Sequence, residues 1–358
     1  MITVIVSILV FGFLIFIHEF GHYITARIFK VTIDEFSIGM GPRLFSWKSK
    51  KTNIKYSLAL FPIGGFVAMP GENGEYNEGA KESSEPDPYR DDPNTFGKKP
   101  AWQRLIITAA GATINIVFGF LAMIVLTCLI NIGNTRVAEY HTAEDLGMEP
   151  TSMNKLCVGD EIVEVGGKRV RILDELSYEI MRHGNEPVDI VVIRGGEEIT
   201  LENVVFPTQT DQGQSFGVMD FKVNRVKKTF GSVMKYSWSK SALIVRMVWE
   251  SLYDLITGRY SFAAVSGPVG ISSAIGSAAK AGFTSLLYIT VLISINLGVM
   301  NLLPIPALDG GRLLTIIIEL ITRKKLPAKV EGIINGVGLM LLLGLSMVIM
   351  VKDVIQLL

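Results

Sequence analysis

Long apolar stretches without charged side chains dominate the pattern of this chain. Asp, Glu, Lys and Arg are absent from four blocks, namely 2–17, 105–130, 281–308 and 332–351. A helix of about 20 apolar residues crosses the hydrocarbon of a bilayer. Three blocks reach that length, and a helical pattern extends the first to about Phe29. The pattern therefore predicts four transmembrane helices, at about 2–29, 102–130, 283–303 and 332–351.

The first connection, 31–101, begins with short runs that alternate between apolar and polar residues. These runs are Phe36–Ile38, Arg43–Trp47 and Ile54–Leu60, and they are separated by Gly39–Pro42 and followed by Pro62–Gly65. Short runs punctuated by glycine and proline predict a β-hairpin or a small sheet. The acidic stretch that follows, Gly71–Pro93, is predicted to be a mobile loop.

The second connection is long enough for a domain, and we place a small α+β module within residues 134–206. A strand over Leu156–Val170 with a turn at Gly166-Gly167, a helix over Leu173–His183, and strands at Val188–Arg194 and Ile199–Val205 make up this module. The remaining segment, 207–282, is a linker. Within it, apolar residues recur at helical spacing over 231–257. Because Lys235, Lys240 and Arg246 interrupt them, we predict an amphipathic helix that these side chains anchor to the membrane surface.

Composition agrees with a membrane protein and excludes several other classes. Of 358 residues, 49% are hydrophobic and 19% charged, against about 25% charged in soluble domains. This excludes a soluble cytoplasmic enzyme. Net charge is zero, without a basic stripe, so no nucleic-acid partner is expected. Two cysteines make a disulfide framework improbable and predict free, buried thiols. The N-terminus lacks the basic region of a cleavable signal peptide, so 1–30 is expected to stay as a helix.

Basic residues near the ends of the spans predict the orientation. They gather in the connection after the first span and in the one after the third, as Arg27, Lys30, Lys98, Lys99 and Arg104, and as Arg312, Arg323, Lys324, Lys325 and Lys329. Short loops rich in Lys and Arg stay in the cytoplasm. Both connections should therefore face the cytoplasm, with the two termini and the module outside.

The first span carries an HExxH motif, His18-Glu19-Phe20-Gly21-His22. Positions i and i+4 share a helix face, so His18 and His22 can bind one Zn²⁺ while Glu19 acts as general base toward a water that the metal activates. The alternative is a chance match. However, two of the four histidines of the chain lie in this motif, and burying such groups in lipid is costly unless they are functional.

A third metal ligand should lie at a similar depth. Between Lys280 and Arg312 the only Asp, Glu, His or Cys is Asp309. The first and third spans run in the same direction, and His18 and His22 lie about 24 and 30 Å along the first. Asp309 lies at a similar or slightly greater distance along the third, so all three should meet near the cytoplasmic edge. The alternative is that Asp309 caps a helix.

Two groups of polar or small residues within the spans leave alternatives open. Asn301 is surrounded by apolar residues next to the prolines Pro304 and Pro306, and it either orients substrate backbone or satisfies the carbonyls that the prolines leave free. In the second span, Gly111, Asn115 and Gly119 lie on one helical face, which favours close packing against a neighbouring span.

Together these motifs resemble the site-2 protease family of intramembrane zinc metalloproteases. The resemblance rests on HEFGH, on Asn301–Gly311 (NLLPIPALDGG) and on Gly111–Asn115 (GATIN). The module resembles a single PDZ domain through Leu156–Ile162 and Val165–Val170. Other shared segments are Gly39–Pro42, Pro62–Gly65 and Ser266–Ile271. The nearest subgroup is the bacterial regulator-of-sigma-E protease type, although better-known members have two PDZ modules.

The resemblance implies the function and the architecture. It implies that His18, His22 and Asp309 are zinc ligands, that Glu19 is catalytic and Asn301 contacts substrate, and that Pro62–Val67 forms a membrane-dipping β-hairpin beside the site. The expected fold is an α-helical polytopic membrane protein with a small cytoplasmic-side β-hairpin element and an extracytoplasmic α+β PDZ-like domain. Its segments are 1–30 with HExxH, 31–101, 102–130, 134–206, 207–282, 283–311 with the LDG motif, and 332–352.

Two functions follow from these expectations. The first is an intramembrane zinc endopeptidase of the bacterial cytoplasmic membrane. It would cut single-span membrane proteins, such as anti-sigma factors or remnant signal peptides, in regulated intramembrane proteolysis, where an upstream protease can act first. An edge strand such as Ile54–Leu60 would hold the substrate extended. The second is a non-catalytic membrane scaffold with a PDZ module. A complete set of base and ligands favours the enzyme.

Overall fold

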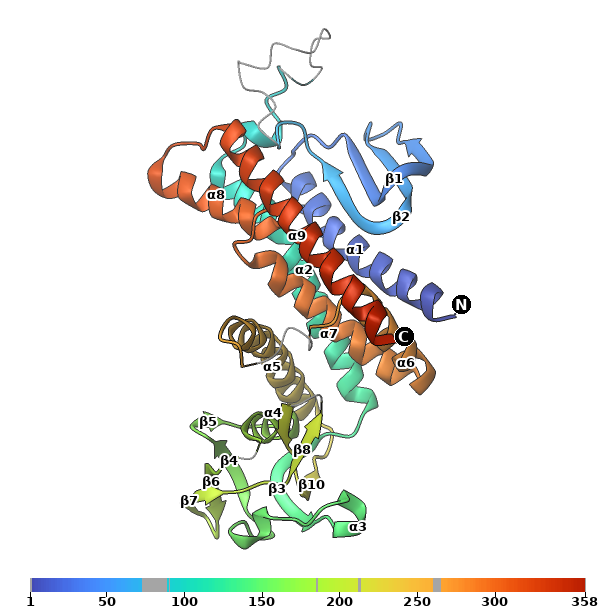
Figure 1. The fold of residues 1–358 in the computed structure, drawn as a ribbon. Coiled ribbons are helices and arrows are strands. Elements are labelled where there is room, and N and C mark those ends of the chain that lie inside the picture. Colours follow the sequence, from blue (N-terminus) through green and yellow to red (C-terminus); the bar gives the residue numbers. More distant parts are fainter. Residues whose placement is uncertain are drawn as a thin grey trace. The chain divides into compact units, whose positions relative to one another are not determined.

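The computed structural model describes residues 2–72, 89, 91–184, 186–211, 214–259 and 265–357. The chain divides into two compact units (Figure 1). Unit 1 comprises residues 1–119 and 261–358, and unit 2 comprises residues 120–260. The boundary falls inside a long helix, α2 (Ala101–Leu129). The segment predicted as a mobile loop, Gly71–Pro93, lies for the most part outside the described residues.

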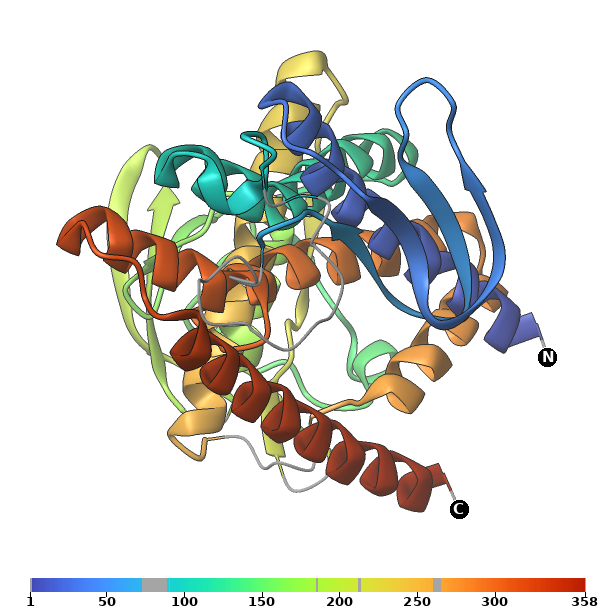
Figure 2. The ribbon, with the colours of Figure 1, turned by 90° about the horizontal axis from the view of Figure 1, so that it is seen from above.

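Four long apolar helices lie where the sequence predicted membrane spans. Within the described residues, the helical segments long and apolar enough to cross a membrane are Ile2–Ile28, Ala101–Leu129, Phe283–Leu302 and Lys329–Ile355. They belong to α1 (Ile2–Ile28), α2, α7 (Phe283–Leu302) and α9 (Ala328–Leu357). In the described part of unit 1 there are also two shorter helices, α6 (Pro268–Ala281) and α8 (Asp309–Thr322), and a 3-10 turn, η1 (Phe96–Lys98). Both chain ends lie at the same end of this unit (Figures 1 and 2).

Two bent strands form the small sheet of unit 1, β1 (Glu35–Lys48) and β2 (Lys55–Ala68). Glu35 aligns with both Lys55 and Ala68, and Lys55 aligns with both Glu35 and Lys48. Each strand therefore bends, and its two halves pair separately. Gly39, Gly41 and Gly64 have φ of 85°, 90° and 77°, a region that glycine enters without steric cost. The predicted small sheet is confirmed, but these glycines bend the strands instead of ending them.

The open edge of this sheet differs from the expected one. The segment 55–58 pairs with 35–38 on one side and with 45–48 on the other. The prediction that Ile54–Leu60 is an edge strand is therefore wrong. Among the described residues, Gly65–Ala68 pairs only with Glu35–Ile38, so this segment at the end of β2 is an edge.

Unit 2 contains an α+β module, which we define as residues 133–225. Its main sheet has the order β10-β3-β4-β6-β7, with β5 paired to β4. The strands are β3 (Gly133–Tyr140), β4 (Glu161–Val165), β5 (Lys168–Arg169), β6 (Val188–Arg194), β7 (Glu197–Val204) and β10 (Phe221–Arg225), and a separate pair is β8 (Thr208–Asp211) with β9 (Gln214–Gly217). The helical elements are α3 (Ala143–Leu146), η2 (Ser152–Asn154) and α4 (Leu173–His183). The predicted helix 173–183 and strand 188–194 are confirmed.

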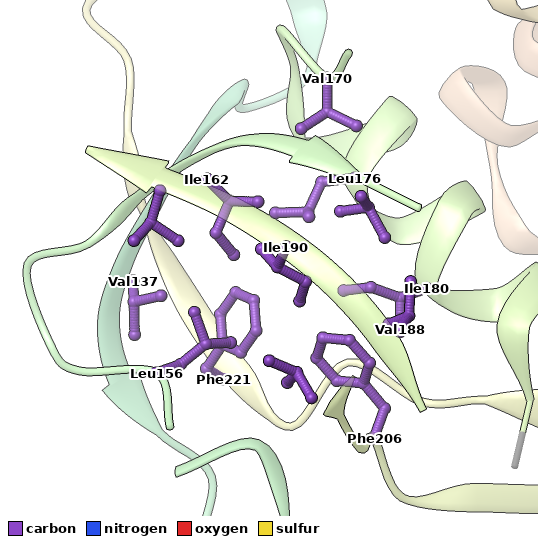
Figure 3. Close-up of a cluster of buried hydrophobic side chains, with 13 residues drawn as sticks. Val137, Leu156, Ile162, Val170, Leu176, Ile180, Val188, Ile190, Phe206 and Phe221 are labelled. Carbon is purple, nitrogen blue, oxygen red and sulfur yellow. The ribbon is translucent and has the colours of Figure 1, made fainter. Parts of the chain in front are cut away.

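A large apolar core of the module lies between α4 and the sheet (Figure 3). Leu176 and Ile180 of α4 and Ile162 and Ile190 of the sheet have 0% exposed surface. Phe221 of β10 is also fully buried in this core, and β10 pairs with β3. The sheet therefore continues beyond residue 206, to Arg225.

The helix predicted over 231–257 exists as α5 (Phe230–Ile256), but its basic residues do not anchor it to lipid as expected. Lys240 is 7% exposed, and its Nζ lies 2.8 Å from Asp174 Oδ1 of α4. Arg246 forms an ion pair with Glu179 of α4. The lipid-anchor role predicted for these two residues is thus wrong, because α4 carries the carboxylates that neutralise them.

The two cysteines, Cys128 and Cys157, are free, as predicted. Both are exposed, so the prediction that they are buried is wrong.

Candidate metal centre

The two histidines of the HExxH motif lie one turn apart on α1 and face α2. Their ring centroids are 4.9 Å apart, and His22 is 8% exposed. Small residues make room for them: a Cβ on Gly21 would lie 2.6 Å from the carbonyl oxygen of Ala110. A Cβ on Gly111 would collide with the His22 ring. Glycine at these positions lets the two helices approach closely around the imidazoles.

Asp309 reaches the same place from the start of α8. Between α7 and α8 the chain folds back over this helix start, and a Cβ on Gly311 would lie 2.6 Å from the carbonyl oxygen of Ile305. The loop is also tied to α9, because the Ala307 amide donates to Asn335 Oδ1 at 3.3 Å. No side-chain cap is formed at the start of α8, so the capping alternative for Asp309 is not supported.

Three donor atoms from these residues converge. His18 Nε2 and His22 Nε2 lie 3.1 and 3.3 Å from Asp309 Oδ2, and 3.3 Å from each other. For a tetrahedral zinc with bonds of about 2.0–2.1 Å, ligand atoms are separated by about 3.3 Å. The triangle of donor atoms therefore has the dimensions of one face of a zinc coordination tetrahedron.

The hydrogen bonds of the imidazoles leave these Nε2 atoms available for a metal. His22 Nδ1 lies 2.8 Å from the carbonyl oxygen of Ile107, which can only accept, so Nδ1 carries the proton. His18 Nδ1 lies 3.3 Å from the side-chain amide of Asn115. With the amide oxygen of Asn115 turned toward it, Nδ1 donates there as well. Among the described residues, buried Asp309 Oδ2 has no hydrogen-bond partner. Three lone pairs facing one another fit a cation.

Asn115, for which the sequence favoured packing, also contacts His18, one of the candidate ligands. Its side chain is fully buried, and its backbone carbonyl accepts a hydrogen bond from Ser294 of α7 at 2.8 Å. The packing role predicted for this helix face is confirmed at Gly119, where a Cβ would press on Ile295 of α7. The spacing Gly111-x-x-x-Asn115 was the available signal, since it puts both residues on the face turned to the histidines.

Glu19 borders a cavity of about 180 Å³ that also includes the three donor residues. Gly65 of the sheet edge lies against it, since a Cβ there would be 2.8 Å from Glu19 Cγ. Residues of β2 and the following turn complete this wall, namely Gly65, Phe66, Val67 and Met69. The sheet edge, the metal ligands and a carboxylate thus share one cavity.

The structure does not place Asn301 in the wall of this cavity. Asn301 lies in the last turn of α7, and its side chain has no hydrogen bond to another described residue. The alternative in which its amide satisfies carbonyls freed by Pro304 and Pro306 is therefore not supported.

A second cavity, of about 270 Å³, adjoins the first. Glu72 and Arg312 line both cavities and form an ion pair with each other. Burial raises the pKa of the Glu72 carboxyl, and the Arg312 charge opposes this shift. Arg104 and Glu319, 2.5 Å apart, border the second cavity. A polar path therefore leads from the donor atoms past Glu72 and Arg312.

An HExxH pair on an apolar helix, a carboxylate from another helix and an acidic side chain beside them define the class of membrane-embedded metallopeptidases. The family model "Peptidase family M50" matches residues 6–345, and the chain belongs to this family. A Clostridium acetobutylicum protein named "Putative zinc metalloprotease" is 33% identical over 354 residues, covering 99% of this chain and 97% of that protein.

Other relatives agree with this family. A Fusobacterium nucleatum protein, also named "Putative zinc metalloprotease", is 34% identical over 358 residues, covering 98% of both chains. The "Regulator of sigma-W protease RasP" of Bacillus subtilis is 25% identical over 427 residues, again covering 98% of both chains. The predicted resemblance to site-2 proteases is confirmed. The protein is an intramembrane zinc metalloprotease, which goes against the non-catalytic scaffold.

Proposed function

We propose that His18, His22 and Asp309 hold the zinc ion and that Glu19 is the general base of peptide-bond hydrolysis. The observation that carries this proposal is the triangle of three donor atoms 3.1–3.3 Å apart, in which Asp309 Oδ2 has no hydrogen-bond donor among the described residues. When bound, zinc supplies a Lewis acid that polarises the scissile carbonyl and makes water a stronger acid.

The residues around the ion position the ligands and move protons. Ile107 and Asn115 orient His22 and His18 through their Nδ1 atoms, which fixes the tautomer that leaves Nε2 free. Glu19, which is 9% exposed, accepts a proton from the attacking water and passes it to the leaving amine. No hydrogen bond from another described residue occupies its carboxylate, so it can turn to the water.

The substrate strand binds along the sheet edge Gly65–Ala68 in this proposal. A transmembrane helix hides its peptide bonds, so it must unwind before water can attack. An edge strand offers backbone hydrogen bonds to an extended segment, and Gly65 touches Glu19. A segment paired there passes directly beside the base. Asn301 contacts the backbone of the same substrate farther along.

The substrates are single-span membrane proteins of the bacterial cytoplasmic membrane, such as anti-sigma factors or remnant signal peptides, cut after an upstream protease has trimmed them. The name of the Bacillus subtilis relative refers to sigma-W regulation, which supports the anti-sigma factor class. The loops rich in Lys and Arg face the cytoplasm. Water and the released fragment pass through the cavity beyond Glu72 and Arg312. The module, PDZ-like and outside, restricts access by bulky substrates.

Cleavage of a defined substrate tests this function. The full chain and its Glu19→Gln variant are placed in vesicles with a single-span substrate, with or without a folded extracytoplasmic domain. We expect the active protein to cut the short substrate within its span and the longer one more slowly, and the variant to cut neither. Equal cleavage by the variant would show that Glu19 is not the base. Equal cleavage rates for both substrates would show that the module does not restrict access, and the peptidase function would still stand.

A further inference from the structure

Helix α5 of unit 2 has two opposite faces, and the module covers only one. Tyr236, Leu243 and Asp254 are 5%, 6% and 1% exposed. At 100° per residue these three lie within about 20° of one another around the helix. Arg182 of α4 reaches Asp254 through two hydrogen bonds of 2.7 and 3.2 Å. Charges and apolar side chains together hold this face of α5 on the module.

The opposite face is apolar, aromatic and exposed. Trp238 is 67% exposed, Trp249 53%, Tyr253 67% and Ile256 84%. These four residues, which we call the aromatic face, fall within about 60° of the helix circumference and extend over about 27 Å along its axis. A soluble surface seldom carries such a continuous apolar stripe unless something covers it.

Two features of unit 2 indicate that lipid covers this stripe. First, Trp and Tyr concentrate at membrane–water interfaces, where the ring is buried and its polar atom stays wet. Second, the stripe begins at α2, a candidate membrane span: the rings of Phe120 and Trp238 meet edge to face with centroids 5.9 Å apart. Ser237 Oγ donates to Thr127 Oγ1 at 3.0 Å. The aromatic face thus begins where α5 packs on the end of α2, a helix long and apolar enough to cross a membrane.

We propose that the aromatic face of α5 lies in the lipid interface of the membrane and that α5 carries the module on its other side. The basic side chains do not supply the attachment, because Lys240 and Arg246 are paired with α4. Since the module packs directly on α5, it stands about one helix diameter, roughly 10 Å, above the interface. This placement of α5 in the lipid interface does not depend on the roles proposed for the residues of the metal centre.

Fluorescence quenching of a single tryptophan tests the proposal in the full chain. Replacing Trp47, Trp102 and Trp238 with Phe leaves Trp249 as the reporter, since the chain has four tryptophans. The protein is placed in neutral phosphatidylcholine vesicles whose acyl chains carry bromine at a shallow or a deep position. The control has all four tryptophans replaced with Phe and carries Glu197→Trp on exposed β7.

We expect shallow bromine to quench Trp249 more than deep bromine, and aqueous iodide to quench it several-fold less than the control tryptophan. Iodide quenching equal to that of the control would place the face in water and overturn the proposal. If neither iodide nor bromine quenches Trp249 and copies of the chain can be cross-linked through position 249, a second copy covers the aromatic face. That result would also overturn the proposal.

A pair of variants separates the aromatic face from a lysine anchor. In the Trp249 background, Tyr253→Ser with Ile256→Ser should raise iodide quenching at least twofold, because the stripe loses two of its four apolar side chains. Lys235→Gln, which removes an exposed positive charge on α5, should leave quenching unchanged. If Lys235→Gln raises iodide quenching and the two serine substitutions do not, the lysine charge holds α5 at the membrane. That result would refute the proposal that the aromatic face does so.

Discussion

Buried carboxylates of the two units differ in whether the protein supplies hydrogen-bond donors to them. In the module, Asp160 is 1% exposed and receives two hydrogen bonds from Arg194, at 2.7 and 2.8 Å. Asp220 is fully buried and accepts the backbone amides of Thr151 and Ser152, each at 2.9 Å. Each of these charges is thus compensated by donors of the protein itself.

In unit 1, two carboxylates of the cavity, Asp309 and Glu19, have no such donors among the described residues. Asp309 Oδ2 faces two imidazole nitrogens that present lone pairs, and Glu19 has no donor among the described residues. In the same unit, the buried carboxylate of Glu35 accepts hydrogen bonds from Arg43 at 2.6–2.8 Å and from Ser57. A buried charge without a protein donor is costly, so these two carboxylates indicate a partner that is not part of the chain.

The largest effect is expected when a carboxylate without a donor is removed. Asp309→Ala should abolish stoichiometric zinc binding and with it all activity, because only two ligands remain. Metal analysis of the purified protein measures this. Glu35→Gln is the matched control, since it removes a buried carboxylate that has its own donors; it should keep one zinc per chain. A full zinc content in Asp309→Ala would show that the third ligand lies elsewhere.

Glu19→Gln should keep the zinc and lose activity. The amide has nearly the same shape but cannot accept the proton, so we expect a loss of about 10²–10⁴-fold in kcat. Cleavage of a single-span substrate and metal content are measured on the same preparation. If zinc is lost together with activity, Glu19 contributes to binding the ion. That result would contradict the proposal that Glu19 acts as the base and not as a ligand.

Asn115→Ala should weaken zinc binding about 10–100-fold, as expected when the residue that orients a metal-bound histidine is removed. A competition titration with a chelator gives the affinity. Ser294→Ala is the control, because it removes the hydrogen bond to the backbone of Asn115 and leaves the amide facing His18. If Asn115→Ala and the unchanged protein bind zinc with equal affinity, Asn115 serves only in packing.

The smallest effect is expected in the module, where the donor can be removed instead of the carboxylate. Arg194→Ala should destabilise the module by about 2 kcal/mol, because it leaves the Asp160 carboxylate with one amide donor. Hydrogen exchange at the β4 amides of the full chain measures the change. Arg194→Lys, which keeps a positive charge, should lose less. An unchanged exchange rate in Arg194→Ala would mean that water replaces the guanidinium at no cost.

The same pair predicts a pH dependence. Burial raises the pKa of Asp160, but Arg194 and the Cys157 amide outweigh it and hold the pKa below its ordinary value. A lowered pKa stabilises the fold above about pH 4, and this contribution is lost as the pH falls further. Arg194→Ala should therefore flatten the decline of module stability below pH 4. If the stability of the Arg194→Ala module declines as steeply below pH 4 as that of the unchanged protein, other carboxylates cause the decline.

The sequence alone predicted the four helices and the three donor residues that the structure brings together. Apolar blocks free of charge form helices in a membrane whatever surrounds them, because each helix satisfies its own backbone hydrogen bonds. His18 and His22 share a face through helical periodicity, and Asp309 is the only Asp, Glu, His or Cys between Lys280 and Arg312. The helix 173–183 and the turn at Gly166-Gly167 followed from equally local signals.

Only the tertiary structure decided the features that depend on pairing between distant segments. Whether Ile54–Leu60 or Gly65–Ala68 is the edge depends on how two bent strands align. That Lys240 and Arg246 face α4 and not lipid depends on carboxylates more than 60 residues earlier in the chain. The bond from Asn115 to His18 spans 97 residues. Periodicity gives the face of a helix, but what packs against that face is set by long-range contacts that a local pattern does not contain.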